Sequence, residues 1–297
     1  MPENSVSLLA QTKALLKEFG LHARKGLGQH FLIDRAALSA SISAAELTPA
    51  DVVVEVGPGL GALTEALAGA AGRVIAIEID PRMADLLAQR FAHLPNVTIV
   101  NADILQVDIT DVLKGELPFD PPSYKVVANL PYYVATPTIR RFLEAEIKPK
   151  CMVVMIQKEV ARSIVARPGD MSILSVSVQI YGNPSIVEYV PAQSFYPPPK
   201  VDSAIVRIEV YDQPVAEIDM EGFFRVVKAG FCAPRKQLRN ALAKGLSILP
   251  ADAAGLLEIA GISPKRRAET LSVEEWVGLY RTIVISPPFA GGEQGLS

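Results

Sequence analysis

The sequence predicts an α/β protein with a doubly wound, mostly parallel sheet and a second, smaller domain made of helices. From Asp51 onward, short apolar runs alternate with segments of helical periodicity, the pattern of repeated strand and helix units. A glycine-rich turn at residues 55–62 follows the first apolar run, and after Val210 the periodicity becomes helical throughout. A chain of 297 residues is long enough for two domains.

The strands are predicted from runs rich in β-branched residues that show no polar alternation. Such runs suit strands covered on both faces, as in a parallel sheet. The five runs lie at residues 52–56, 73–79, 97–102, 124–129 and 151–157.

Helices are predicted between these strands, and a different arrangement is expected at the end of the sheet. The helical segments lie at residues 61–71, 81–94 and 136–146. Three further segments follow without long helices between them, at residues 172–182, 185–190 and 203–211. Because parallel strands need long crossovers, we expect this end of the sheet to be antiparallel.

Four parts are expected along the chain. Residues 1–50 form an N-terminal segment, 51–211 the sheet domain, 212–284 the helical domain and 285–297 a disordered tail, which is small and polar. Three consecutive prolines in the segment before residue 203 predict a stiff, extended linker.

Composition narrows the class of protein. Hydrophobic residues make up 49% of the chain, which is ample for a core, and no apolar run approaches the roughly 18 residues of a membrane span. The start of the chain lacks the pattern of a secretion signal, so we expect a cytoplasmic protein without a membrane partner. Two cysteines, Cys151 and Cys232, exclude a disulfide framework, and we expect both to be buried.

Charge is distributed unevenly along the chain. The net charge is −3, yet ten basic residues stand against five acidic ones between Gly222 and Arg281. A basic surface on an otherwise acidic body is typical of a protein that contacts nucleic acid.

The glycine-rich turn indicates a nucleotide-like cofactor. Gly57 and Gly59 allow a sharp turn and a close approach of the backbone to a ligand at a helix N-terminus. Together with Ala62 they satisfy the dinucleotide fingerprint, so the turn alone leaves nicotinamide and S-adenosylmethionine about equally favoured.

Two acidic residues follow at the ends of the next strands. Glu78 ends the second strand, where a carboxylate can accept from both ribose hydroxyls, and Asp103 follows the third, where it can accept from an adenine amine. Because the carboxyl ends of parallel strands meet at one edge, the glycine turn and both acids are expected there.

The fourth strand ends in Asn129, Leu130, Pro131 and Tyr132, and this end decides between the two cofactors. Hydride transfer has no need for such a group, whereas methylation of an exocyclic amine does. The lone pair of adenine N6 is delocalised until its hydrogens are held out of plane. The Asn129 side-chain oxygen and a backbone carbonyl held by Pro131 are two acceptors for those hydrogens, and Tyr132 offers a face for the flipped-out base.

With these residues in view, the chain resembles the ribosomal RNA adenine N6,N6-dimethyltransferases of the KsgA type, which act on small-subunit RNA. The likeness runs from "HARKGLGQHFL" at His22 to "RAETLS" ending at Ser272. It includes "EVGPGLGALT", "NLPYYVATP", "QKEV" and "FYPPPKVDSAIV". The resemblance implies a Rossmann-like fold of the S-adenosylmethionine-dependent methyltransferases, with residues 1–50 closing over the cofactor and RNA site.

The resemblance also implies a role for each matching residue. The catalytic positions are Asn129, Leu130, Pro131, Tyr132 and Phe195, with the target adenine held between Tyr132 and Phe195. The cofactor-binding positions are His30, Leu32, Gly57, Gly59, Glu78, Asp103 and Asn129, with Gln29 and Glu55 as weaker candidates. No metal is implied.

Two departures from the family pattern are visible. His30 stands where the family often has asparagine, and a ring nitrogen can serve the same contact. After "NLPY" a common family form is Asn-Ile-Ser-Thr-Pro, whereas Tyr133, Val134 and Ala135 precede Thr136 here. The second departure concerns the shape of the pocket lip.

Basic residues are candidates for contacts with RNA phosphates. For each residue of the two C-terminal clusters a solvated helix face is an equally good interpretation, whereas Arg24 and Lys25 are better placed because their segment is expected near the active site. The candidates are Arg24 and Lys25 beside the N-terminal motif, Arg235, Lys236 and Arg239 in one cluster, and Lys265, Arg266 and Arg267 in another.

The resemblance implies a substrate and leaves rivals. The family dimethylates two adjacent adenosines in the 3′-terminal hairpin loop of small-subunit (16S) rRNA, in a late pre-ribosomal particle, and we expect a monomer. The rivals are a large-subunit rRNA adenine methylase of the antibiotic-resistance type, a nicotinamide oxidoreductase, and a non-catalytic RNA-binding assembly factor.

Overall fold

The computed structural model describes residues 7–24, 29–115 and 123–285. The chain divides into two compact units, which are treated separately. The first comprises residues 1–162 with 183–212, and the second comprises 163–182 with 213–297. Residues 163–182, which we expected in the sheet domain, therefore group with the C-terminal helices.

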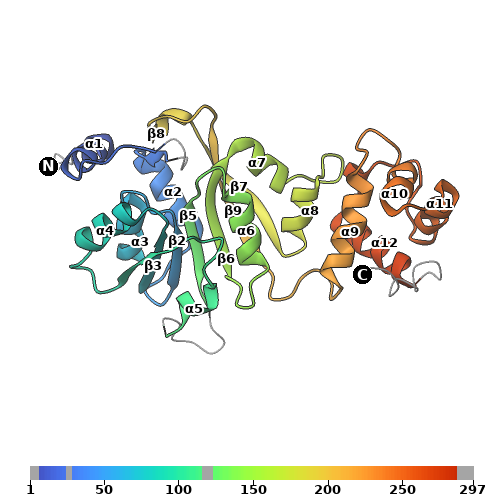
Figure 1. Ribbon diagram of the computed structural model, residues 1–297, viewed down its shortest axis with the longest axis horizontal. Helices are drawn as coiled ribbons and strands as arrows, with labels where there is room; N and C mark the ends of the chain where they lie inside the picture. Colours follow the sequence, from blue (N-terminus) through green and yellow to red (C-terminus); the bar gives the residue numbers. More distant parts are fainter. Residues whose placement is uncertain (1–6, 25–28, 116–122, 286–297) are drawn as a thin grey trace. The chain divides into compact units, whose positions relative to one another are not determined.

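The first unit is built on a seven-stranded sheet with the order β4-β3-β2-β5-β6-β9-β7 (Figure 1). The strands from β4 to β6 are parallel, and β9 pairs with β6 antiparallel. The predicted parallel sheet with an antiparallel end is thus confirmed. The strands are β2 Val52–Val56, β3 Arg73–Glu78, β4 Val97–Asn101, β5 Lys125–Asn129, β6 Cys151–Gln157, β7 Gly182–Val190 and β9 Ser203–Val210.

Helices cover this sheet because they offer apolar faces to strands that are themselves buried. Val53 on β2 and Val153 on β6 share a core with Leu63 and Leu67 of α3. The strand order is that of a doubly wound sheet: β3 and β4 follow β2 on one side, and β5 and β6 are added on its other side. The helices are α1 Leu8–Glu18, α2 Arg35–Ala45, α3 Ala62–Ala70, α4 Pro81–Arg90, α5 Ile109–Leu113, α6 Ala135–Leu143 and α7 Lys158–Ile164.

A small second ladder joins the N-terminal segment to the segment before β9. Strand β1, Phe31–Leu32, pairs antiparallel with β8, Phe195–Tyr196. Phe31 lies opposite Tyr196 and Leu32 opposite Phe195. This pairing fixes residues near position 30 against residues near 195, although more than 160 residues of chain separate them.

The second unit is helical, as its periodicity predicted. Trp276 of α12 is fully buried, and its ring centroid lies 5.5 Å from that of Phe231 on α9. The helices are α8 Ile173–Gln179, α9 Met220–Phe231, α10 Leu238–Leu246, α11 Pro250–Ile259 and α12 Val273–Ile285.

Two expectations were wrong. Residues 172–182 were grouped with the late strands, but they contain α8, which begins with a capping box in which Ser172 and Ser175 bond each other's backbone N–H groups. Its serines are buried together with its valines, so the alternation of serine and valine does not separate two faces. Cys151 is buried as expected, whereas Cys232 at the end of α9 is exposed.

Within the described ranges, none of the helices combines the length and apolar character that crossing a bilayer requires.

Gly61 offers a test of the packing at the start of α3. Its φ is +83°, and a Cβ there would lie 2.6 Å from the Phe91 ring, so Gly61→Ala should lower the free energy of unfolding by about 1–3 kcal/mol. Gly69, inside α3, has open space around its Cβ position, and Gly69→Ala should be neutral or stabilising by about 1 kcal/mol. Urea denaturation of both variants checks this, and equal stabilities would contradict the packing described.

Candidate functional site

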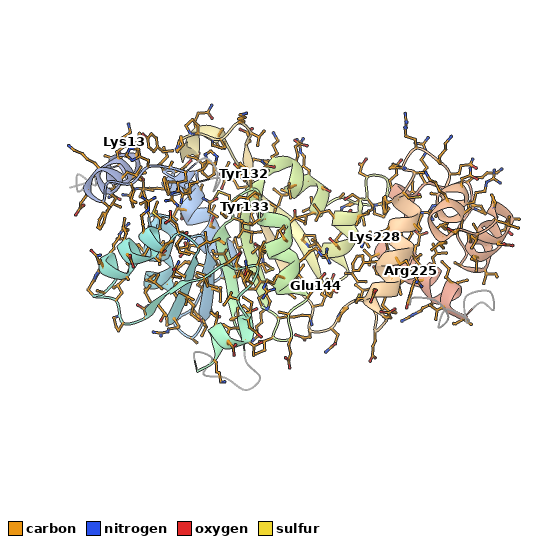
Figure 2. The ribbon with its side chains drawn as sticks, viewed as in Figure 1. Lys13, Tyr132, Tyr133, Glu144, Arg225 and Lys228 are labelled. Carbon is orange, nitrogen blue, oxygen red and sulfur yellow. The ribbon has the colours of Figure 1, made fainter. Side chains whose placement is uncertain are left out.

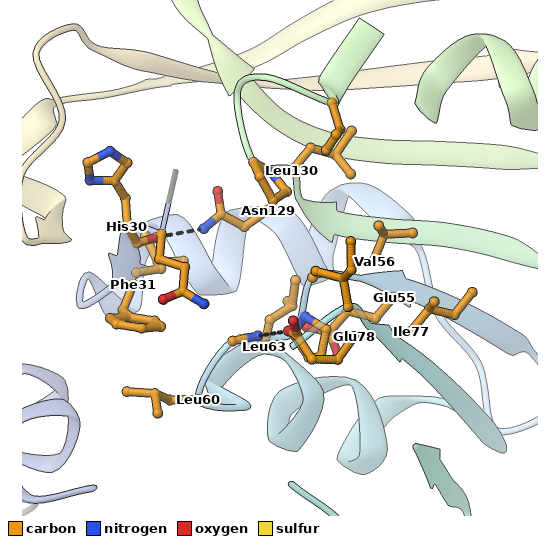
Figure 3. Close-up of a pocket in the computed structure, with 18 of the residues that line it drawn as sticks. His30, Phe31, Glu55, Val56, Leu60, Leu63, Ile77, Glu78, Asn129 and Leu130 are labelled. Atoms are coloured by element: carbon orange, nitrogen blue, oxygen red, sulfur yellow. Dashed lines mark hydrogen bonds between the residues drawn. The ribbon is translucent and has the colours of Figure 1, made fainter. Parts of the chain in front are cut away.

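A pocket opens at the carboxyl edge of the sheet, where β2, β3, β4 and β5 end (Figure 3). The pocket gathers all the catalytic and cofactor-binding positions expected from sequence. They are Gln29, His30, Leu32, Glu55, Gly57, Gly59, Glu78, Asp103, Asn129, Leu130, Pro131, Tyr132 and Phe195.

The turn after β2 keeps its backbone open to the pocket. Gly57 and Gly59 have φ values of +66° and +58°, a region that favours glycine. A Cβ at Gly57 would lie 3.3 Å from the Pro131 ring, and one at Gly59 would lie 3.2 Å from the Phe31 ring. The Gly57 N–H donates to the Ile77 carbonyl oxygen at 2.9 Å, which ties the turn to β3.

Glu78, at the end of β3, is the buried carboxylate of this edge. Its Oε1 accepts from the Asp80 N–H at 2.9 Å and its Oε2 from the Gly59 N–H at 3.4 Å. Burial raises the pKa of Glu78, and hydrogen bonds from the backbone N–H groups of Asp80, Gly59 and Ile79 oppose that rise. A carboxylate has about four acceptor sites, so these backbone donors leave Glu78 able to accept from a ligand's hydroxyl group.

Asp103, after β4, is partly exposed and held by its own turn. Its Oδ1 accepts from the Leu105 N–H and its Oδ2 from Gln106 Nε2, both at 2.9 Å. These contacts fix the carboxylate on the pocket rim with acceptor sites still available.

Glu55 is the least solvated acid of the pocket. It is 1% exposed, Oε2 has no hydrogen-bond partner among the described residues, and burial raises its pKa to about 8. The carboxyl is therefore mostly neutral at pH 7, which spares the glycine turn a second buried charge beside Glu78.

Asn129 is oriented by a contact with the N-terminal segment. Its Nδ2 donates to the His30 carbonyl oxygen at 3.2 Å, as the dashed line in Figure 3 shows. The amide nitrogen is thereby directed to His30, and Oδ1 is left as an acceptor facing away from it. The Leu130 N–H donates to the Met155 carbonyl oxygen at 3.1 Å, so the strand end is fixed to β6.

Aromatic residues also line the pocket. The Tyr132 hydroxyl lies 2.8 Å from Ser203 Oγ, and its ring centroid lies 5.8 Å from that of His30. His30 Nδ1 lies 2.7 Å from the Pro197 carbonyl oxygen, which fixes the imidazole. Phe195 lines the pocket but is only 2% exposed, since it packs in the core. The placement of an adenine between Tyr132 and Phe195 stays a prediction.

The basic candidates differ in how they are engaged. Arg24 Nη1 lies 3.2 Å from the buried Asp80 carboxylate, so this arginine holds the site's own acidic turn. In the second unit, Arg266 binds both oxygens of Glu275 and also contacts Thr270, which makes it a structural residue.

The remaining basic candidates divide by exposure. Arg235, Lys236 and Lys265 are exposed, and none of them has a carboxylate within 4 Å among the residues that the structure describes. Arg267 lies 3.7 Å from Glu269, and the Nε of the partly buried Arg239 has no partner within the described ranges. Lys25 lies outside the described residues.

Sequence reasoning did not name several residues that line the pocket, such as Ile79 and Ile104, and it placed Tyr133 only at the pocket lip. All three line the pocket, and Tyr133 is 53% exposed. Burial raises the pKa of Tyr133, and the charges of Asp103 and Glu78 raise it further, which indicates that its hydroxyl lies near both acids. The unusual tyrosine after "NLPY" was the available signal.

Comparison with known proteins identifies the family. The family model described as "Ribosomal RNA adenine dimethylase" matches residues 20–284. The chain belongs to this family. The resemblance seen in the motifs is therefore confirmed. The predicted enzyme class, a methyltransferase, and the predicted Rossmann-like fold are confirmed as well.

Two relatives align with this chain over nearly their whole length. "Ribosomal RNA small subunit methyltransferase A" of Dehalococcoides mccartyi strain CBDB1 is 51% identical over 91% of each chain. The protein of that name from Moorella thermoacetica is 43% identical over 94% of this chain and 99% of its own.

Two solved structures are similar as well. A dimethyladenosine transferase from Plasmodium falciparum has a TM-score of 0.71 at 25% identity, covering 84% of this chain and 96% of its own. The 23S rRNA methyltransferase ErmE has a TM-score of 0.65 at 30% identity, covering 85% and 98%.

Glu55 gives the site a measurable pH dependence. Its pKa is about 8 in the folded chain against 4.5 as the ordinary value, so the unfolded chain releases this proton first as pH rises. Stability from this group is therefore complete below pH 4.5 and is lost between pH 4.5 and 8, by up to about 1.4 kcal/mol per pH unit.

Glu55→Gln should remove this dependence, so the variant should gain stability relative to the parent chain as pH rises from 5 to 8. Urea unfolding at several pH values measures the difference, with Glu65→Gln on the exposed side of α3 as the control. A difference that does not vary with pH would show that Glu55 is ionised in the fold.

Proposed function

We propose that the chain transfers methyl groups from S-adenosylmethionine to N6 of two adjacent adenosines in the 3′-terminal hairpin loop of small-subunit (16S) rRNA, forming N6,N6-dimethyladenosine. The observation that carries this proposal is the orientation of Asn129, whose amide nitrogen bonds the His30 carbonyl and whose oxygen remains free to accept from an amine. Membership of the rRNA adenine dimethylase family supports the reaction class.

The pocket fits the cofactor. The positive φ of Gly57 and Gly59 leaves a backbone cradle that a Cβ would obstruct, and Glu78 and Asp103 lie at successive strand ends beside it. Glu78 would accept from the ribose hydroxyls and Asp103 from the adenine amine, while His30 and Leu32 would cover the methionine part. When bound, S-adenosylmethionine supplies an electrophilic methyl group on a sulfonium.

The protein's contribution to the chemistry is positioning. Asn129 Oδ1 and the Leu130 carbonyl accept the two N6 hydrogens and turn the nitrogen lone pair out of the ring plane. With the lone pair turned in this way, N6 would be presented to the methyl group that the bound cofactor would supply, and no protein base would be needed for the proton that N6 releases. Tyr132, fixed by Ser203, offers its ring to the base.

The small subunit is favoured as the source of the substrate. The chain is 51% identical to a protein named for the small subunit but only 30% identical to the 23S rRNA methyltransferase of known structure. Both comparisons cover most of the chain, so the two identities can be compared directly. A late pre-ribosomal particle as substrate, a monomeric state and a cytoplasmic location complete the proposal.

Methyl transfer to isolated ribosomal subunits tests the proposed function. Labelled S-adenosylmethionine would be incubated with undermethylated small subunits and, in parallel, with large subunits, and the digested RNA analysed by mass spectrometry. Two adjacent dimethyladenosines in the small subunit are expected. Label only in the large subunit would support the resistance-type alternative, and cofactor binding without transfer would support an assembly factor.

Asn129→Ala should lower kcat for methyl transfer at least 100-fold, because the lone pair of N6 is no longer turned toward the methyl group. Calorimetry should show S-adenosylmethionine affinity within a few-fold of the parent chain. Glu78→Ala is the matched variant, and it should instead weaken cofactor binding. Turnover near that of the parent chain in Asn129→Ala would remove this residue from the chemistry.

The exposed pair Arg235 and Lys236 is expected to contact phosphates. Replacing both by glutamate should weaken binding of small-subunit RNA and reduce the slope of log affinity against log salt by about 0.7–0.9 per lost contact. Lys244→Glu with Arg281→Glu makes the same charge change on exposed residues of the same unit. Equal slopes for the two double variants would return Arg235 and Lys236 to the status of solvated residues.

A further inference from the structure

A second pocket lies in the first unit, beside α1 and the ladder of β1 and β8. It belongs to none of the cofactor or target-base positions described above. It is lined by Lys13, Leu16 and Lys17 of α1, by Leu21 and by Tyr196 of β8, among others. Figure 2 shows Lys13 on α1.

The pocket carries positive charge that the described residues do not neutralise. Lys13 and Lys17 are exposed, and they lie four residues apart on α1, an arrangement of like charges that destabilises a helix. Among the residues that the structure describes, neither has a carboxylate within 4 Å. Two neighbouring ammonium groups without a carboxylate partner are suited to binding an anion.

Helix α1 is held in place by its other face. Leu16 is buried in a cluster with Leu21, Phe31 and Leu60, and Tyr196 packs against the same cluster. The lysines are therefore presented beside a fixed apolar floor. An aromatic wall completes the pocket, since Lys13 Nζ lies 5.3 Å from the centroid of the Tyr196 ring.

The position of Tyr196 in the chain links this pocket to the target-base site. Phe195 and Tyr196 are consecutive residues of β8, and successive side chains of a strand point to opposite faces. Phe195 lines the first pocket and Tyr196 lines the second. Consecutive residues of one short strand therefore line the two pockets, so the pockets are neighbours along β8.

We propose that the second pocket binds a nucleotide that flanks the target adenosine in the single-stranded loop of the RNA. Its base stacks on the Tyr196 ring, and Lys13 and Lys17 bind the adjoining phosphates. The phosphate draws the Lys13 ammonium away from the ring, which frees the ring face for the base. This inference rests on the proposed function, since it assumes an RNA loop whose target base occupies the first pocket.

Photo-crosslinking tests the location directly. A hairpin RNA copying the proposed substrate loop, with 8-azidoadenosine in turn at the nucleotide on each side of the target adenosine, is bound to the full chain and irradiated. One of the two probes should label a peptide containing Tyr196 or residues 13–17. Labelling of both probes elsewhere would overturn the proposal, and because the readout is binding, the result does not depend on methyl transfer.

Variants separate stacking from charge. Tyr196→Leu should raise the RNA KM at least fivefold with kcat little changed. Tyr196→Phe should keep the KM of the parent chain, because only the ring is needed for stacking. Lys13→Glu with Lys17→Glu should reduce the salt slope of RNA binding by about 1.4–1.8 in all.

The matched control is Lys148→Glu with Lys150→Glu, before β6 at the opposite edge of the sheet. Equal RNA affinity and slope in the two double-lysine variants would overturn the phosphate contacts, provided that both retain parent affinity for S-adenosylmethionine. If the parent chain methylates no ribosomal RNA, the proposed function fails, whereas the crosslink and the salt slope still decide whether this pocket binds RNA.

Discussion

The hydrogen bond from Asn129 Nδ2 to the His30 carbonyl oxygen is the contact on which the site depends. It joins the end of β5 to the N-terminal segment, 99 residues away in the chain, and settles which end of the amide faces the pocket. With the nitrogen committed to His30, the oxygen is available as an acceptor. An amide turned the other way would present donors to an amine and could not hold its hydrogens.

Two structural constraints bring the remaining groups to this contact. The parallel order of β4, β3, β2 and β5 places their carboxyl ends at one edge, so Asp103, Glu78, the glycine turn and Asn129 meet there. The antiparallel ladder of β1 and β8 then adds residues from both ends of the first unit. It supplies His30 and Leu32 from one side and Phe195 from the other.

Local chemistry made much of this predictable from sequence. Each β-branched run became a strand, and the residues after four of these strands reached one pocket, because parallel strands share their carboxyl edge. The failures arose where long-range packing decides. The buried serines of α8 imitated strand alternation. The pairing of Arg24 with Asp80 and of Arg266 with Glu275 depends on partners that sequence spacing does not reveal. Tyr133, where the family pattern differs, was expected at the pocket lip and does line the pocket.

The most direct measurement is a crystal structure of the chain with S-adenosylhomocysteine and adenosine bound. The account predicts that adenine N6 lies within about 3.2 Å of Asn129 Oδ1, with Asn129 Nδ2 still bonded to His30 and the base against the Tyr132 ring. An adenine whose N6 points away from Asn129, or an amide whose nitrogen faces the base, would contradict it.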